Sequence, residues 1–200
     1  MLPSAPGSGR RAAFIDRDGV INAELDYVYR VEDFHVLPGA VAGLRQFAEL
    51  GYALVVVTNQ AGIAKGRYSE ADYALLTAHM RELLRRQGVE FAGVYHCPHH
   101  PDGSVARYAV PCACRKPAPG LLLQAATDLG LDLARSVLVG DKISDTQAGR
   151  AAGVRWTVLV ESGHRLPADA LTHADHRCAD LAEAAAWVAE QARPQSREPA

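Results

Sequence analysis

Two aspartates stand two residues apart in the segment FIDRDGVIN, directly after a short apolar run. In an extended segment the side chains at positions i and i+2 point to the same side, so Asp16 and Asp18 would face one cleft. Neighbouring carboxylates repel each other and require a cation or a shared proton. The pair therefore predicts acid–base or metal chemistry, although Asp and Gly also occur together in plain surface turns. Arg17, between the two, is expected to point the opposite way.

Three further groups of polar residues follow later in the chain. The segment VVVTNQAG carries Thr58 at the end of an apolar run and suits either an oxyanion cradle or a plain polar turn. Arg115 and Lys116 form a cationic pair just before a predicted helix, where an anion is well placed. In VLVGDKISD, Asp141 and Asp145 follow another apolar run and offer the carboxylate oxygens that Mg²⁺ takes.

Three of the four cysteines lie in one segment, residues 96–118, which shows no helical or strand periodicity. Compact domains rarely hold unstructured loops longer than about 12–15 residues, so this loop needs a function or a staple. Cys97 and His99, followed by Cys112 and Cys114, give two close pairs of ligands that suit tetrahedral Zn²⁺. The histidines at 96 and 100 remain alternatives for the imidazole ligand. Free thiols are the alternative to a zinc site, and the length of the loop favours zinc.

Short apolar runs alternate with longer amphipathic segments along the chain, which predicts a doubly wound parallel α/β sheet with helices on both faces. The predicted strands are Ala12–Ile15, Ala53–Val57, Phe91–Tyr95, Ser136–Val139 and Trp156–Val160. The predicted helices are Ala40–Leu50, Ser69–Gln87, Pro119–Leu129, Ser144–Ala152 and Leu181–Gln191. In such a sheet ligands bind beyond the carboxyl ends of the strands, where the polar residues above would gather.

Length and composition limit the alternatives. The 200 residues, 48% hydrophobic and 22% charged, predict one domain over residues 11–192, with flexible ends at 1–10 and 193–200. A net charge of −2 gives no field that would attract nucleic acid or anionic membrane. No apolar stretch is long enough for a membrane span or a signal peptide. We therefore expect a cytoplasmic protein, monomeric by default, with a small-molecule partner.

The order of these motifs resembles that of the haloacid dehalogenase-like phosphohydrolases. That superfamily has Asp-x-Asp, a strand-end Thr or Ser, a Lys and Gly-Asp-x-x-x-Asp, and the resemblance covers about residues 12–160. It implies a Rossmann-like fold and an Mg²⁺-dependent phosphatase. By position, it implies that Asp16 is the nucleophile, Asp18 the general acid and base, Thr58 and Lys116 phosphate stabilisers, and Asp141 an Mg²⁺ ligand. Mg²⁺ would also contact the Asp16 carboxylate and the Asp18 carbonyl. Asp145 would support these ligands without binding the ion itself.

The strings CPHHPDGSVARYAVPCACRKPAPGL, RDGVIN, VVVTNQAGIAKG and GDKISD are similar to those of a zinc-loop branch that lacks a large cap domain, the D-glycero-D-manno-heptose 1,7-bisphosphate 7-phosphatases. The resemblance implies a sugar bisphosphate substrate and a structural zinc. It also implies that the substrate is lined by Glu24, Leu25, Asp26, Tyr27, Thr58, Asn59, Gln60, Ala61, Arg115, Lys116 and Lys142.

Three alternatives remain open. A related zinc-loop branch hydrolyses histidinol phosphate. A receiver domain of a signalling relay also forms an aspartyl-phosphate near Mg²⁺, but it lacks an equivalent of Asp18 and of the loop between Cys97 and Cys114. A zinc-finger nucleic-acid module would leave the carboxylates unexplained. The anomer preferred at the 1-phosphate is left open by the sequence.

Overall fold

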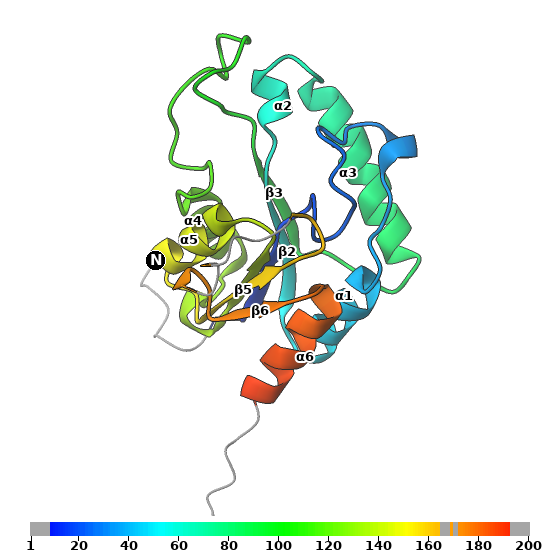
Figure 1. Ribbon diagram of the computed structural model, residues 1–200, viewed down its shortest axis with the longest axis vertical. Helices are drawn as coiled ribbons and strands as arrows, with labels where there is room; N and C mark the ends of the chain where they lie inside the picture. Colours follow the sequence, from blue (N-terminus) through cyan, green and yellow to red (C-terminus); the bar gives the residue numbers. More distant parts are fainter. Residues whose placement is uncertain (1–8, 165–168, 170–171, 193–200) are drawn as a thin grey trace, which may run out of the picture.

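The computed structural model describes residues 9–164, 169 and 172–192. Its centre is a parallel sheet of six strands in the order β3-β2-β1-β4-β5-β6 (Figure 1). The strands are β1 (Ala12–Ile15), β2 (Ala53–Asn59), β3 (Gly93–Cys97), β4 (Val137–Gly140), β5 (Trp156–Val160) and β6 (His176–Cys178). The predicted flexible ends lie almost wholly outside the described residues.

The central strands are buried on both faces, as their continuous apolar runs predict. In β1, Ala13 and Ile15 belong to one hydrophobic cluster, whereas Ala12 and Phe14 belong to the other. This alternation follows from the two-residue period of a strand, so each face of the sheet needs its own cover of helices.

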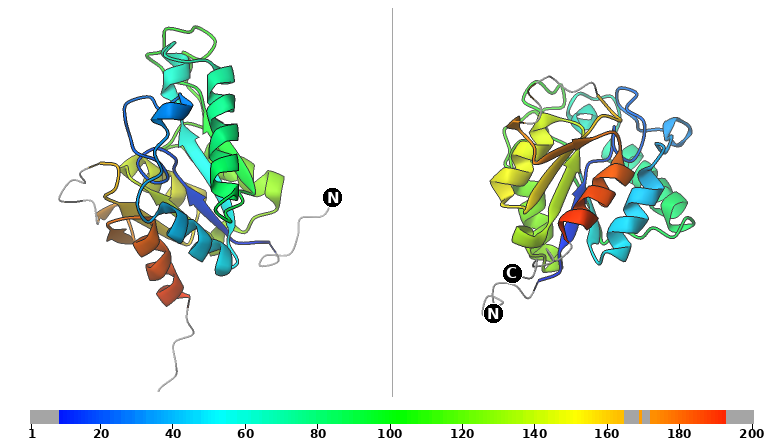
Figure 2. Two further views of the ribbon diagram at one scale, coloured as in Figure 1. Left: turned by 90° about the vertical axis from the view of Figure 1, so that its right-hand side faces the viewer. Right: turned by 60° about the horizontal axis from the view of Figure 1, so that its bottom comes forward.

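Helices cover both faces (Figure 2). One cluster joins α1 (Ala40–Glu49), α3 (Glu70–Arg85) and α6 (Leu181–Gln191) to the sheet, and the other joins α4 (Gly120–Leu129) and α5 (Ile143–Ala152). The short elements are α2 (Ala61–Ala64), η1 (Val31–Asp33) and η2 (Leu133–Arg135). The predicted class, a doubly wound parallel sheet, is therefore confirmed, and none of the described helices is long and apolar enough to span a membrane.

Two details of the sheet differ from the prediction. Strand β3 spans Gly93–Cys97 rather than Phe91–Tyr95, because Phe91 is buried in the core before the chain joins the sheet. Strand β6 was not predicted, since its three residues, His-Arg-Cys, contain no apolar run. Its Cys178 is half-buried and packs against the core, as expected of a small apolar residue.

The strand order places a topological switch point between β1 and β4. From β1 the chain moves outward to β2 and β3, then returns to the other side of β1 to form β4. Connections on the two sides of the switch point run in opposite directions, which opens a crevice at the carboxyl ends of the strands. The segment between β3 and α4, which carries Cys112 and Cys114, lies at this same end, near α2 (Figure 1).

Candidate active site

The end of β1 holds a buried ion-pair cluster. Asp16 follows β1 directly, and its Oδ1 lies 2.9 Å from the ammonium of Lys116. Lys116 also lies 2.6 Å from Asp145 Oδ1 and donates a hydrogen bond to the carbonyl of Val57 at 2.8 Å. An ammonium has three donors, and here three oxygens face it. Lys116 is therefore held rigidly beside Asp16.

Asn59 positions the backbone of this lysine. Its side-chain amide donates to the carbonyl of Lys116 and accepts from the Lys116 N–H, both at 3.0 Å. These two hydrogen bonds link the end of β2 to a residue 57 positions later in the chain. The amide in the VVVTNQAG segment thus orders Lys116.

Three carboxylates meet beside this lysine. One oxygen each from Asp16, Asp141 and Asp145 lies within 4.8 Å of the other two. Burial, together with the charges of Asp145 and Asp141, raises the pKa of Asp16 to about 7 even though Lys116 opposes the shift. Asp141 Oδ1 is buried without a hydrogen-bond donor, and Asp16 Oδ1 faces only the ammonium of Lys116. Hard carboxylate oxygens left in this way fit a divalent cation such as Mg²⁺.

The carboxylate of Asp18 is held by neighbours of its own. Arg17 donates to it through Nε at 3.1 Å and through Nη2 at 2.8 Å. Asn22 and Gln60 each donate one further bond at 3.0 Å. The expectation that Arg17 points away is therefore wrong: its side chain, 1% exposed, turns back onto Asp18 because a buried guanidinium needs a carboxylate.

Gly19 allows the two sides of the switch point to approach each other. Its φ is +86°, and a Cβ there would lie 2.2 Å from Asp141 Oδ2. The residue beyond β5, His164, hydrogen-bonds through Nδ1 to this same oxygen of Asp141. Asp141 therefore keeps only its Oδ1 without a partner among the described residues.

These groups form the inner end of a cavity of about 600 Å³. Nearly all the predicted substrate-lining residues do line it, and Leu25, which is 53% exposed, does not. The residues that line the cavity include Asp16, Asp18, Glu24, Asp26, Tyr27, Thr58, Asn59, Gln60, Ala61, Lys65, His100, Arg115, Lys116, Lys142, Asp145 and His164.

The segment after β1 forms one wall of this cavity. Asp26 and Tyr27 both adopt left-handed backbone conformations, with φ of 53° and 69°. Non-glycine residues enter this region at a cost of about 1–3 kcal/mol and do so where the surroundings demand it. Tyr27 packs with Tyr29 on the cluster of Ile63, Tyr68 and Tyr73, which holds the segment over α2.

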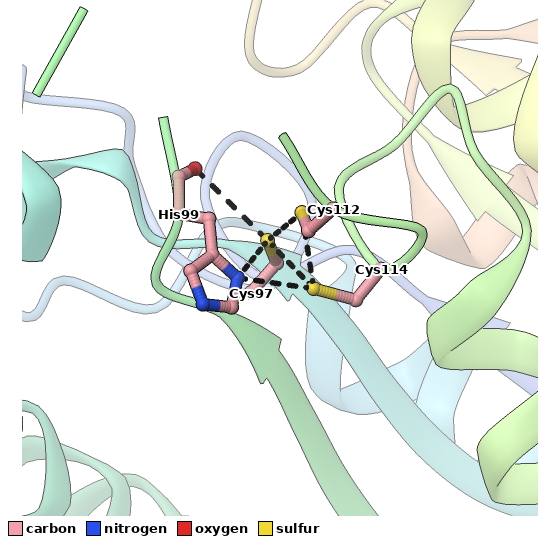
Figure 3. Close-up of side chains that lie close together, drawn as sticks. All are labelled: Cys97, His99, Cys112 and Cys114. Carbon is pink, nitrogen blue, oxygen red and sulfur yellow. Dashed lines mark hydrogen bonds between the residues drawn. The ribbon is translucent and has the colours of Figure 1, made fainter. Parts of the chain in front are cut away.

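A second cluster of ligand atoms lies in the 96–118 loop (Figure 3). The Sγ atoms of Cys97, Cys112 and Cys114 lie 3.0–3.5 Å apart, and His99 Nδ1 lies 3.7 Å from Cys97 and 3.4 Å from Cys114. Bond lengths of about 2.3 Å to sulfur and 2.0–2.1 Å to nitrogen give tetrahedral edges of roughly 3.5–3.8 Å. The four atoms therefore fit one tetrahedral metal ion.

The neighbouring histidines have other partners. His96 Nε2 lies 2.9 Å from Glu70, and His100 Nδ1 accepts the N–H of Asp102 at 3.1 Å. His99 is thus the imidazole of the cluster. Arg115, next after Cys114, donates to the carbonyl of His99 at 3.4 Å and lines the cavity, so the cluster and the cavity share a wall.

Sequence reasoning missed four residues of the site: Arg17, Lys65, His100 and His164. The sequence predicts that Arg17 points away and marks His100 only as a possible zinc ligand, because the contacts of these residues leave no spacing. For Lys65 a signal was available, because the chain has only three lysines and this one stands in the string VVVTNQAGIAKG.

Comparisons with known proteins agree with this geometry. A family model described as HAD-hydrolase-like matches residues 113–184. D-glycero-alpha-D-manno-heptose-1,7-bisphosphate 7-phosphatase of Photorhabdus laumondii is 47% identical over 77% of this chain and 84% of its own length. The corresponding beta-named enzyme of Escherichia coli K12 is 43% identical over 92% of this chain and 96% of its own. This chain belongs to the heptose-bisphosphate phosphatase family of HAD-like hydrolases.

Structural similarity leads to the same family. The D,D-heptose 1,7-bisphosphate phosphatase of B. bronchiseptica, whose structure contains magnesium and phosphate, has a TM-score of 0.76 and 30% identity, covering 91% of this chain and 99% of its own. The chain is accordingly a phosphate monoester hydrolase. The receiver-domain and zinc-finger alternatives are not supported, because these relatives are phosphatases.

Proposed function

We propose that this enzyme removes the 7-phosphate of D-glycero-D-manno-heptose 1,7-bisphosphate and retains the 1-phosphate, a reaction of nucleotide-activated heptose synthesis for lipopolysaccharide. The observation that carries the proposal is the distribution of charge in the cavity. Asp16, Lys116 and Asp145 form a buried group in its lining, and the half-buried Arg115 is a separate cation of the same lining. An extended sugar with a phosphate at each end matches this layout, and the names of the relatives specify the sugar.

Asp16 is the proposed nucleophile. Its carboxylate attacks the phosphorus, the bond from phosphorus to the sugar oxygen breaks, and Asp18 gives its proton to that departing oxygen. Asp18 then takes a proton from water, which attacks the aspartyl-phosphate and releases inorganic phosphate. The hydroxyl of Thr58, near the carboxyl end of β2, and the ammonium of Lys116, beside Asp16, line the cavity and stabilise the transferring oxygens.

Mg²⁺ would be held by the carboxylates of Asp16 and Asp141 and by the carbonyl of Asp18, where it would reduce the repulsion between nucleophile and phosphate. The unpartnered Oδ1 of Asp141 and its closeness to the Asp16 carboxylate support this assignment. Asp145 is the supporting residue, because its Oδ1 faces Lys116 and its Oδ2 accepts the N–H of Lys142 at 2.9 Å.

We also propose a structural zinc on Cys97, His99, Cys112 and Cys114. Four protein ligands leave no open position for water, so the ion would hold the loop rather than react. The four cysteines of the chain are free, which suits a reducing compartment such as the cytoplasm. We keep a monomer as the proposed state.

Phosphorus NMR tests the substrate assignment. Purified enzyme with Mg²⁺ receives, separately, the alpha and beta heptose 1,7-bisphosphates and histidinol phosphate. We expect the signal of the 7-phosphate to disappear first, with the anomeric signal retained and one anomer consumed faster. Earlier loss of the anomeric signal, or faster turnover of histidinol phosphate, would contradict the assignment.

A further inference from the structure

The lysines of this chain are confined to one place. There are three among 21 cationic residues, Lys65, Lys116 and Lys142, and all three line the catalytic cavity. Lys116 is paired with two aspartates and Lys142 with Glu24. Lys65 differs from both, because no carboxylate of the described residues lies within ion-pair distance of it. The proposed reaction gives it no role.

Lys65 is held in place all the same. Its ammonium donates to the hydroxyl of Tyr27 at 3.0 Å and lies 5.7 Å from the centre of that ring. Tyr27 is itself held in a left-handed conformation on the aromatic cluster over α2. An ammonium with one hydrogen bond keeps two free donors. The strained backbone conformation of Tyr27 therefore positions the phenol that holds the Lys65 ammonium at the cavity.

Two more donors lie close to Lys65 on the same wall. His100 accepts the Asp102 N–H at Nδ1, which leaves Nε2 to carry the ring hydrogen and to donate. The N–H of Val105 donates to the carbonyl of Ala64 at 2.9 Å, which places the turn after His100 against the residue before Lys65, and Arg115 donates to the carbonyl of His99 at 3.4 Å. Of the acidic lining residues on this side, Glu24 is paired with Lys142, and Asp26 is exposed to solvent, which screens its charge.

We propose that Lys65, oriented by Tyr27, joins His100 and Arg115 in a second anion site that binds the phosphate which is not cleaved. Lys65 is thereby a specificity residue that favours bisphosphates over monophosphates. This inference rests on the proposed function, because it requires a substrate with a phosphate at each end. A compact ammonium and a neutral imidazole N–H suit phosphate oxygens, and Arg115 adds a planar fork.

The test compares two substrates that differ only in the second phosphate: heptose 1,7-bisphosphate and heptose 7-phosphate. The quantity measured is the ratio of their kcat/KM values for wild type and for Lys65→Met, which keeps the length of the stem and removes the charge. We expect the ratio to fall on the order of 10- to 100-fold, through KM of the bisphosphate, because one charge-assisted bond is lost. Lys65→Arg should recover most of the ratio.

Arg107→Met is the matched control, since it removes an exposed cation that lies outside the catalytic cavity, in the loop between β3 and α4. An equal fall of the ratio in this control would attribute the effect to general charge and would overturn the inference. An unchanged ratio in Lys65→Met, or an equal loss on both substrates, would overturn it as well. A wild type that does not prefer the bisphosphate would instead refute the proposed function, so the two failures are distinguishable.

Protection from chemical labelling gives a readout independent of turnover. Trace acetylation followed by peptide mass spectrometry should modify Lys65 before the buried Lys116. Heptose 1-phosphate, which carries only the retained phosphate, should slow the labelling of Lys65 several-fold, whereas heptose 7-phosphate should slow it less. Equal protection by both monophosphates would contradict the assignment of Lys65 to the second site.

Discussion

The two ends of the catalytic cavity are held by different forces. At the inner end Asp16, Lys116, Asp141 and Asp145 are each at most 6% exposed and stand on or beside the buried strands of the sheet. At the outer end, residues 98–118, past the end of β3, have no helix or strand and are mostly exposed or half-exposed. Hydrophobic burial and backbone pairing hold the first region, and the Cys-His cluster must hold the second.

Lys116 shows that the two regions depend on each other. It follows Cys114 by two positions, yet its ammonium is buried at the inner end between Asp16 and Asp145. Asn59 clamps its backbone from the side of the sheet. The position of Lys116 is therefore fixed twice, by hydrogen bonds from the sheet and by the neighbouring Cys-His cluster. Variants of the sheet side and of the cluster side should separate these two contributions.

Replacing Asp16 should have the largest effect. Asp16→Asn keeps the shape of the side chain but removes the proposed nucleophile, so phosphate release should fall by about 10⁴-fold or more, in the range seen when covalent catalysis is lost. The fold should persist, because the asparagine also removes a buried charge. Steady-state phosphate release measures the loss, with Asp128→Asn on α4 as the exposed control. Near-wild-type turnover would rule out the covalent mechanism.

Loss of the cluster should have the next largest effect. Cys112→Ser removes one of the four ligands, and metal analysis of the purified variant should show less than one zinc per chain. A displacement of Arg115 and Lys116 by about 1 Å would cost on the order of 100-fold in rate. Cys178→Ser is the matched control, since Cys178 lies on β6 outside the cluster. Zinc-free wild-type protein with full activity would show that the sheet alone suffices.

Arg17 offers a smaller and more selective effect at the inner end. Arg17→Gln removes the fork that orients Asp18, so proton delivery to the leaving group should suffer. We expect kcat to fall about 10- to 100-fold for alkyl phosphates, whose leaving groups need the proton. For p-nitrophenyl phosphate, whose leaving group needs little help, the fall should be at most a few-fold.

The ratio of these two rates does not depend on the folded fraction. That matters because breaking a buried ion pair costs about 3–5 kcal/mol. Asp18 keeps Asn22 and Gln60 as donors in the variant. Equal losses on both phosphates would mean that Arg17 supports the fold and not the proton transfer.

The sequence predicted the inner end better than the outer one, and the reason is physical. Apolar runs and strand-end polar residues determine where Asp16, Thr58 and Asp141 meet, because parallel strands share one carboxyl edge. The partners of these residues could not be predicted in the same way. Arg17 turns back onto Asp18, and His164 reaches Asp141 from beyond β5, only because the chain folds over itself there. Neither contact leaves a period or a spacing in the sequence.

The outer end shows the converse. The spacing of Cys97, His99, Cys112 and Cys114 predicted a staple, and the atoms do converge. The role proposed for Lys65 could not be predicted, because it depends on the left-handed backbone conformation of Tyr27. No glycine in that segment indicates such a conformation. The edge strand β6 could not be predicted either, because its sequence shows no alternation of apolar and polar residues.

The smallest predicted effect concerns pH and separates the two metal sites. In the metal-free protein, burial and the nearby Asp145 and Asp141 raise the pKa of Asp16 to about 7. Below that pH Asp16 carries a proton, and a cation can bind its carboxylate only by displacing it. The apparent Mg²⁺ affinity should therefore weaken as the pH falls below about 7, by at most about tenfold per unit, and should level off above it.

Calorimetric Mg²⁺ titration in buffers of different ionisation enthalpy measures this proton release directly. We expect up to about one proton released per Mg²⁺ bound near pH 6 and progressively less near pH 8. Asp16→Asn should abolish the release, since asparagine has no proton to give up, whereas Cys178→Ser should leave it unchanged. Zinc should be retained over the same range, because the binding of a four-ligand site is strong enough to outcompete protons there. Affinity for Mg²⁺ that did not change with pH would mean that Lys116 keeps Asp16 ionised without any metal, and the inner end would then be prepared for catalysis by the protein alone.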